Sequence, residues 1–134
     1  MSAHEYSVQF RISGDIVPDQ VTAHLGLQPN HIRIAGSVVH GRKLEQSLWS
    51  FSGAPEGIFV DPSETLEEGL RHLLEKLAPK KELLQSYIDN NDAIWWCGHF
   101  QSSFDGGPTL SPALLVSLAA FGVPLYIDNY FCEE

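Results

Sequence analysis

Cys97 and His99 are the residues whose types and spacing could carry out chemistry. They stand two positions apart in the segment 93–103, which has the composition of a β-strand, so both side chains face the same side. A thiol beside an imidazole can become a nucleophilic thiolate, and Asp128 from a second predicted strand could approach the pair. No nucleophile motif surrounds Cys97, and cysteine is commonly a small buried hydrophobe. A pocket of Cys97, His99 and Asp128, in an enzyme or a small-ligand sensor, is therefore an alternative hypothesis.

Other chemical signals in the sequence are weak. No two histidines stand at helical i, i+4 spacing and no Cys-x-x-Cys occurs, so no metal site and no cofactor is predicted. The turn 105–108, Asp-Gly-Gly-Pro, leads toward a helix but lacks the lysine and the glycine spacing of a phosphate-binding loop. It is interpreted as a plain turn.

The charge balance excludes several classes of partner. Eight Lys and Arg residues against 17 Asp and Glu residues give a net charge of −9, which repels phosphate backbones and anionic lipids. We therefore expect no nucleic-acid partner and no membrane partner. With 134 residues, of which 43% are hydrophobic, the chain is expected to form one domain over residues 1–134. The absence of a signal sequence, of a long apolar run and of paired cysteines favours a cytoplasmic protein.

Periodicity in the first half predicts three strands and a helix. Segment 6–13 alternates apolar and polar residues, as a half-buried strand does. Pro18 suits the first turn of a short helix, which Gly26 ends. Segment 31–39 is expected to be a strand with Ile32 and Ile34 inward. Segment 47–52 is expected to pair with it as a hairpin, across a turn at 40–43.

The second half predicts two helices, a long strand, a further helix and a last strand. Asp61 is the expected N-cap of the first helix, with Pro62 at its first position and Glu64 in a capping box. Leucines at helical spacing follow up to Leu77, and a second helix follows Pro79. Strand 93–103, a helix that starts at 111–112 and a strand over 123–131 complete the chain.

A repeat of strand, turn, helix and strand opens and closes the protein. Each half is interpreted as a β-α-β unit. Two such units, interleaved, predict an α+β fold: a ferredoxin-like antiparallel sheet of about five strands with the helices on one face.

Several short stretches, in this order, resemble a known family. They are Phe10-Arg11-Ile12-Ser13-Gly14, Pro18, Leu25-Gly26-Leu27-Gln28-Pro29, Gly36, Leu48-Trp49-Ser50-Phe51-Ser52, Leu110-Ser111, Leu118-Ala119-Ala120-Phe121-Gly122 and Tyr130. The chain resembles the uncharacterised bacterial family catalogued as domain of unknown function 4279. The resemblance implies a compact, intracellular, single-domain protein, and it carries over no catalytic residues.

The face of the sheet without helices, called the open face below, is the expected place of function. On strand 93–103, the side with Trp96 and Phe100 is the more uniformly apolar and is assigned to the core. Leu125, Ile127 and Phe131 are likewise expected to point inward. The residues expected on the open face are Arg11, Trp95, His99, Gln101, Tyr126, Asp128 and Tyr130.

Aromatic rings with polar tips beside an arginine are typical of recognition surfaces. The leading hypothesis is a non-enzymatic protein-binding module that uses this face. The negative net charge favours a basic partner, which an inhibitory or toxin-neutralising protein would restrain. Another hypothesis is a structural homodimer that buries its open faces against each other.

Overall fold

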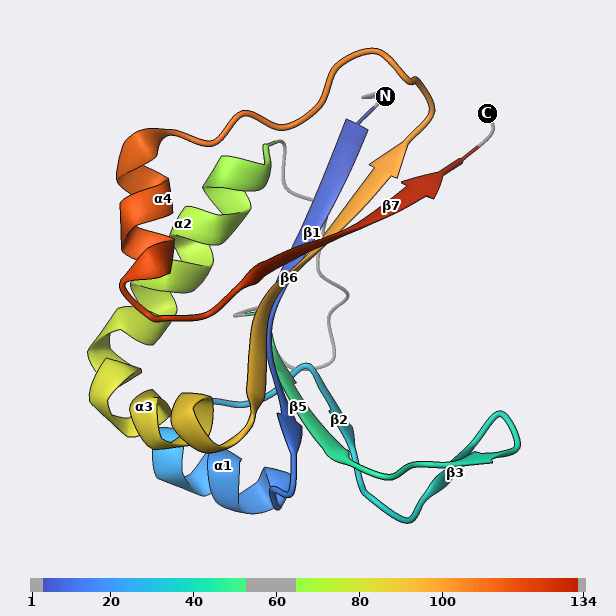
Figure 1. The fold of residues 1–134 in the computed structure, drawn as a ribbon, viewed down its shortest axis with the longest axis vertical. Helices are drawn as coiled ribbons and strands as arrows, with labels where there is room; N and C mark the ends of the chain where they lie inside the picture. The colour runs from blue at the N-terminus through green and yellow to red at the C-terminus, as the bar shows by residue number, and fades with distance from the viewer. Residues whose placement is uncertain (1–3, 53–64, 133–134) are drawn as a thin grey trace.

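The fold is one five-stranded sheet with its helices on one side (Figure 1). A computed structural model describes residues 4–52 and 65–132. In spatial order the strands are β2 (His31–Arg33), β5 (Ser47–Phe51), β1 (His4–Gly14), β6 (Asp92–Gln101) and β7 (Leu125–Phe131). The α-helices are α1 (Pro18–Leu25), α2 (Leu66–Leu77), α3 (Lys81–Asn90) and α4 (Pro112–Ala119), with a 3₁₀ turn η1 (Ala78–Lys80) between α2 and α3. Within the described residues, no helix is long and apolar enough to cross a membrane.

Strand β1 is the centre of the sheet and pairs antiparallel with both β5 and β6. Its alternation is confirmed, because Tyr6, Val8, Phe10 and Ile12 are buried while their neighbours are only partly covered. The apolar side chains of β1 pack under α2 and form one core with the leucines of that helix. The two sides of β1 therefore fix which face of the sheet is the core.

The mixed α+β class is confirmed, but the purely antiparallel sheet is wrong, and the ferredoxin-like arrangement is not confirmed. Strand β7 lies parallel to β6 at the edge of the sheet. The chain leaves β6, passes through α4 and returns in the same direction, so the second β-α-β unit adds β7 beside its own first strand. In the first unit, β5 lies between β1 and β2.

The predicted strand over 31–39 is shorter than expected. Only β2 joins the sheet, antiparallel to β5 as the predicted hairpin required. Ile32 is paired with the buried Trp49 and so points to the helix side as expected, but it is exposed there because β2 is an edge strand. Ile34 lies beyond the end of β2 and is exposed. The following residues form a separate hairpin of β3 (Val38–Val39) and β4 (Arg42–Lys43). His40 and Gly41, with φ of 51° and 77°, make its turn.

The helix ends explain where the elements stop. Helix α2 begins at Leu66, and the Thr65 hydroxyl accepts the Glu68 N–H at 3.1 Å. The predicted start of this helix at Asp61, Pro62 and Glu64 lies outside the described residues. The expected end of α1 is confirmed, because Gly26 has the left-handed φ of 66°.

Candidate functional site

The side of strand β6 that faces the helices is not the side that was predicted from the sequence. Trp95 is fully buried in the core, between the rings of Phe10 and Phe121 at centroid distances of 5.0 and 5.4 Å. Cys97 and His99 are buried on the same side as Trp95, and Gln101 follows the same alternation. The predicted placement of Trp95, His99 and Gln101 on the open face is therefore wrong. Both sides of β6 carry large apolar residues, so alternation alone could not decide which side is buried.

Four of the predicted residues do share the open face. Arg11, Tyr126, Asp128 and Tyr130 lie there, and they are joined by two aromatic residues that sequence reasoning assigned to the core, Trp96 and Phe100. The register explains this, because Trp96 is paired with Gln9 on one side and with Tyr126 on the other. We call Trp96, Phe100, Tyr126 and Tyr130 the aromatic half of the open face.

Asp128 anchors the aromatic half. The Trp96 indole N–H donates to its carboxylate at 2.8 Å, and the Tyr130 hydroxyl donates to the same oxygen at 3.3 Å. The hydrogen bond from Trp96 lowers the pKa of Asp128, and burial opposes this shift. The hydrogen bond of Tyr126 to this carboxylate raises the pKa of Tyr126. Asp128 therefore remains an anion that orients the rings around it.

Arg11 joins the aromatic half to the rest of the face. Its guanidinium lies over the Trp96 ring, 4.1 Å from the centroid, which is a cation–π contact. Its Nε–H donates to Gln9 Oε1 at 2.9 Å, and the Ser50 hydroxyl donates to the same oxygen at 2.8 Å. Burial lowers the pKa of Arg11. The terminal amino groups of Arg11 make no hydrogen bond to the described residues, so they are free to bind an external acceptor.

Positive charge gathers on the other half of the face. On β2, the Arg33 Nε–H donates to His31 Nε2 at 3.2 Å. Burial lowers the pKa of His31, and the positive charges of Arg33 and Arg11 lower it further. A depression of about 680 Å³ adjoins them and is lined by Arg33, Arg42 and Lys43, together with Glu45. Together with Arg11, the residues Arg33, Arg42 and Lys43 make up four of the eight Lys and Arg residues in the chain. We call Arg11, Arg33, Arg42 and Lys43 the cationic half; His31, with its lowered pKa, is a neutral residue among them.

The proposed catalytic group does not assemble. Cys97 and Asp128 lie on opposite faces of the sheet, and burial raises the pKa of Cys97 to about 12, so its thiol stays protonated at neutral pH. His99 contacts the Asn129 oxygen at 3.1 Å and the His4 ring at 2.8 Å, and stacks on Tyr6. In the described parts of the chain, no group of three or more His, Cys, Asp or Glu residues is placed to hold a metal ion.

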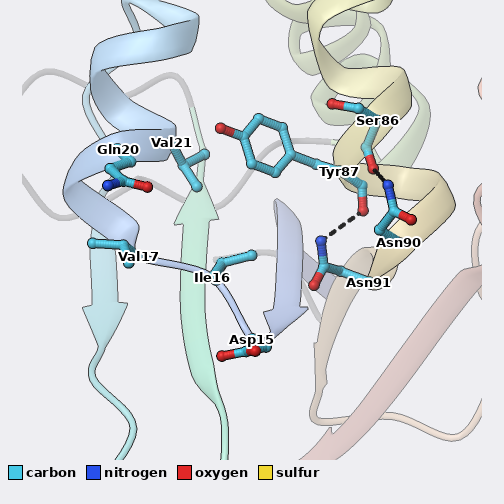
Figure 2. A pocket seen from close by; sticks show the side chains of 9 residues that line it. All are labelled: Asp15, Ile16, Val17, Gln20, Val21, Ser86, Tyr87, Asn90 and Asn91. Atoms are coloured by element: carbon cyan, nitrogen blue, oxygen red, sulfur yellow. Dashed lines mark hydrogen bonds between the residues drawn. The ribbon is translucent and has the colours of Figure 1, made fainter.

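A second depression, of about 250 Å³, lies between α1 and α3 (Figure 2). Figure 2 shows the Tyr87 ring directed from α3 toward α1, above Ile16. The side-chain amides of Asn90 and Asn91 donate to the carbonyls of Ser86 and Tyr87, at 2.7 and 3.1 Å. These amide donors bind backbone carbonyls near the C-terminal end of α3, where carbonyls lack partners within the helix. Asp15 is the one charged residue that lines this second depression, whereas the open face combines several charged and aromatic side chains. The open face is therefore the better candidate.

Sequence reasoning missed Trp96, Phe100, His31 and Arg33. One signal could have placed the first two. Gly98 stands between them at two-residue spacing, and a Cβ there would lie 2.7 Å from the Trp96 ring and 3.0 Å from the Phe100 ring. A glycine that two large rings flank in a strand indicates that the rings meet over it. No comparable signal marks His31 or Arg33.

No curated protein and no solved structure matches this chain. One family model matches residues 4–132, which is nearly the whole chain and agrees with the resemblance seen in the sequence. The chain belongs to the family described as Domain of unknown function (DUF4279).

Proposed function

We propose that the chain is a non-enzymatic protein-binding module that holds an acidic segment of a partner protein on its open face. The observation that carries this proposal is the division of the face into a cationic half and an aromatic half, which Arg11 joins over the Trp96 ring. Arginine and large aromatic residues are the side chains that dominate binding energy at protein interfaces.

The distribution of charge decides the chemistry of the partner. The net charge of −9 by itself favours a basic partner. The open face, however, concentrates Arg11 and Arg33 beside the basic depression, and the carboxylate of Asp128 is already satisfied by its neighbours. A carboxylate-rich segment with apolar side chains complements both halves of this surface. Arginine can bind such a carboxylate with two parallel hydrogen bonds.

Arg11 is expected to contribute a large part of the affinity. The probe is a short peptide of alternating glutamate and tyrosine, titrated calorimetrically into the wild-type protein and into Arg11→Gln. We expect the substitution to weaken binding by roughly 10-fold, since it removes a charged hydrogen bond. Lys76→Gln is the matched control, because it removes one positive charge from the exposed side of α2 and should bind like the wild type.

Three further arms of this experiment identify the partner class. Rising salt concentration should weaken the complex, because the charges of the face are screened. A peptide of alternating lysine and tyrosine should bind less tightly than the acidic one. The proposal is wrong if the lysine peptide or a single-stranded oligonucleotide binds more tightly, or if Arg11→Gln binds like Lys76→Gln.

A further inference from the structure

The outer edge of β7 has no pairing partner in the described sheet. Its seven residues, LYIDNYF, contain no proline and no lysine, which are two of the usual means by which proteins protect an edge strand. Its one charged residue, Asp128, accepts hydrogen bonds from Trp96 and Tyr130 of the same chain. The opposite edge strand, β2, has three residues and carries His31 and Arg33. Of the two edges, β7 is therefore the one suited to pairing with a further strand.

The backbone of β7 presents a regular set of free groups. At one end of its ladder with β6, the Trp95 N–H donates to the Pro124 carbonyl at 2.9 Å. At the other end, the Cys132 N–H donates to the Gln101 carbonyl at 2.7 Å. In a parallel ladder, alternate residues direct both backbone groups to the same neighbour. The groups that point to the free edge are thus those of Leu125, Ile127, Asn129 and Phe131.

The side chains beside these groups are exposed on both faces of the sheet. Tyr126 and Tyr130 are 50% and 42% exposed on the open face. On the helix side, Ile127 and Phe131 are 37% and 48% exposed. A strand added at this edge would cover apolar surface on both faces, which is the main favourable term in association.

We propose that β7 pairs antiparallel with β7 of a second copy of this chain, about a two-fold axis at Asn129. This register sets Ile127 opposite Phe131 of the second copy, and both residues have their backbone groups directed outward. On the open face it sets Asp128 opposite Tyr130 of the second copy, so that no two like charges lie directly opposite each other. An axis at Asp128 would instead place the two carboxylates opposite each other, about 4.5 Å apart between Cα atoms.

The two-fold axis makes one continuous sheet across both copies and leaves both open faces on the same side. This inference does not rest on the proposed function, because it uses the free backbone edge and not the cationic half. Salt distinguishes the two. Each copy carries a charge of −9, so screening should strengthen self-pairing, whereas it should weaken binding of an acidic segment.

The test combines sedimentation of the full chain with amide hydrogen exchange at several protein concentrations. We expect a dimer that strengthens with salt, and slower exchange at Ile127, Asn129 and Phe131 as concentration rises. Ile127→Pro removes an outward N–H, a place where an edge strand tolerates proline. It should raise the dissociation constant at least ~10-fold relative to the matched Ile127→Ala, which keeps the N–H.

Circular dichroism checks that Ile127→Pro keeps the fold. Ile127→Glu is a second variant, which adds a carboxylate to the paired edge and should also separate the copies. A monomer at all concentrations would overturn the proposal. So would a dimer that survives both variants, since copies paired through their open faces would behave in this way, and so would a monomer whose β7 pairs with a strand of another protein.

Discussion

Trp95→Ala is expected to lower the free energy of unfolding by about 3–5 kcal/mol, as large-to-small changes in a protein core do. Trp95 is fully buried and makes edge-to-face contacts with Phe10 and Phe121, at interplanar angles of 61° and 80°. Removing the ring leaves a cavity between β1, β6 and the end of α4, and the rigid neighbours cannot fill it. Urea unfolding followed by far-ultraviolet circular dichroism measures the change.

Two variants make this result specific to the buried position. In the described residues, the Trp95 indole N–H has no hydrogen-bond partner, so Trp95→Phe loses ring volume but also removes an unsatisfied donor. It should cost less than ~2 kcal/mol. Tyr126→Ala, on the half-exposed open face, should change the free energy by less than ~1 kcal/mol. An effect of Trp95→Ala as small as that of Tyr126→Ala would contradict the placement of Trp95.

Gly98→Val is expected to destabilise the protein by about 1–3 kcal/mol and to disturb the aromatic half. The Trp96 and Phe100 rings close over Gly98, so a branched side chain there must push both rings apart. Because Trp96 also donates to Asp128, its displacement should break that hydrogen bond and shift the indole N–H signal in the NMR spectrum.

Gly107→Val is the matched glycine control for this prediction. A Cβ at Gly107 would meet nothing within 4 Å. The control should therefore leave both the unfolding free energy and the Trp96 signal close to those of the wild type. Equal effects of the two substitutions would show that the rings do not meet over Gly98.

Strand β1 and helix α1 could be predicted from the sequence because the local pattern there allows one solution. In β1 one side is apolar and the other polar, so burial follows directly from alternation. Gly26 adopts the left-handed backbone conformation that favours glycine, so its residue type alone indicates where α1 ends. Neighbouring elements do not change these outcomes.

Strand β6 and its partner β7 could not be predicted, because tertiary pairing decides them. Both sides of β6 carry large apolar residues. Trp95 points into the core because it is paired with the buried Phe10 of β1. The parallel direction of β7 depends on the position it takes beside β6, which no local pattern encodes. The site was therefore half predicted: Arg11 and Asp128 were placed correctly, and the tryptophan between them was not.

The indole N–H signals give the most direct test of the claim that the open face is the binding surface. The chain has three tryptophans, at positions 49, 95 and 96. Trp49 and Trp95 are buried on the helix side, whereas Trp96 lies under Arg11 on the open face. In a titration with the glutamate–tyrosine peptide, the Trp96 indole signal should move while those of Trp49 and Trp95 stay in place. Movement of the Trp95 signal with a fixed Trp96 signal would contradict the account.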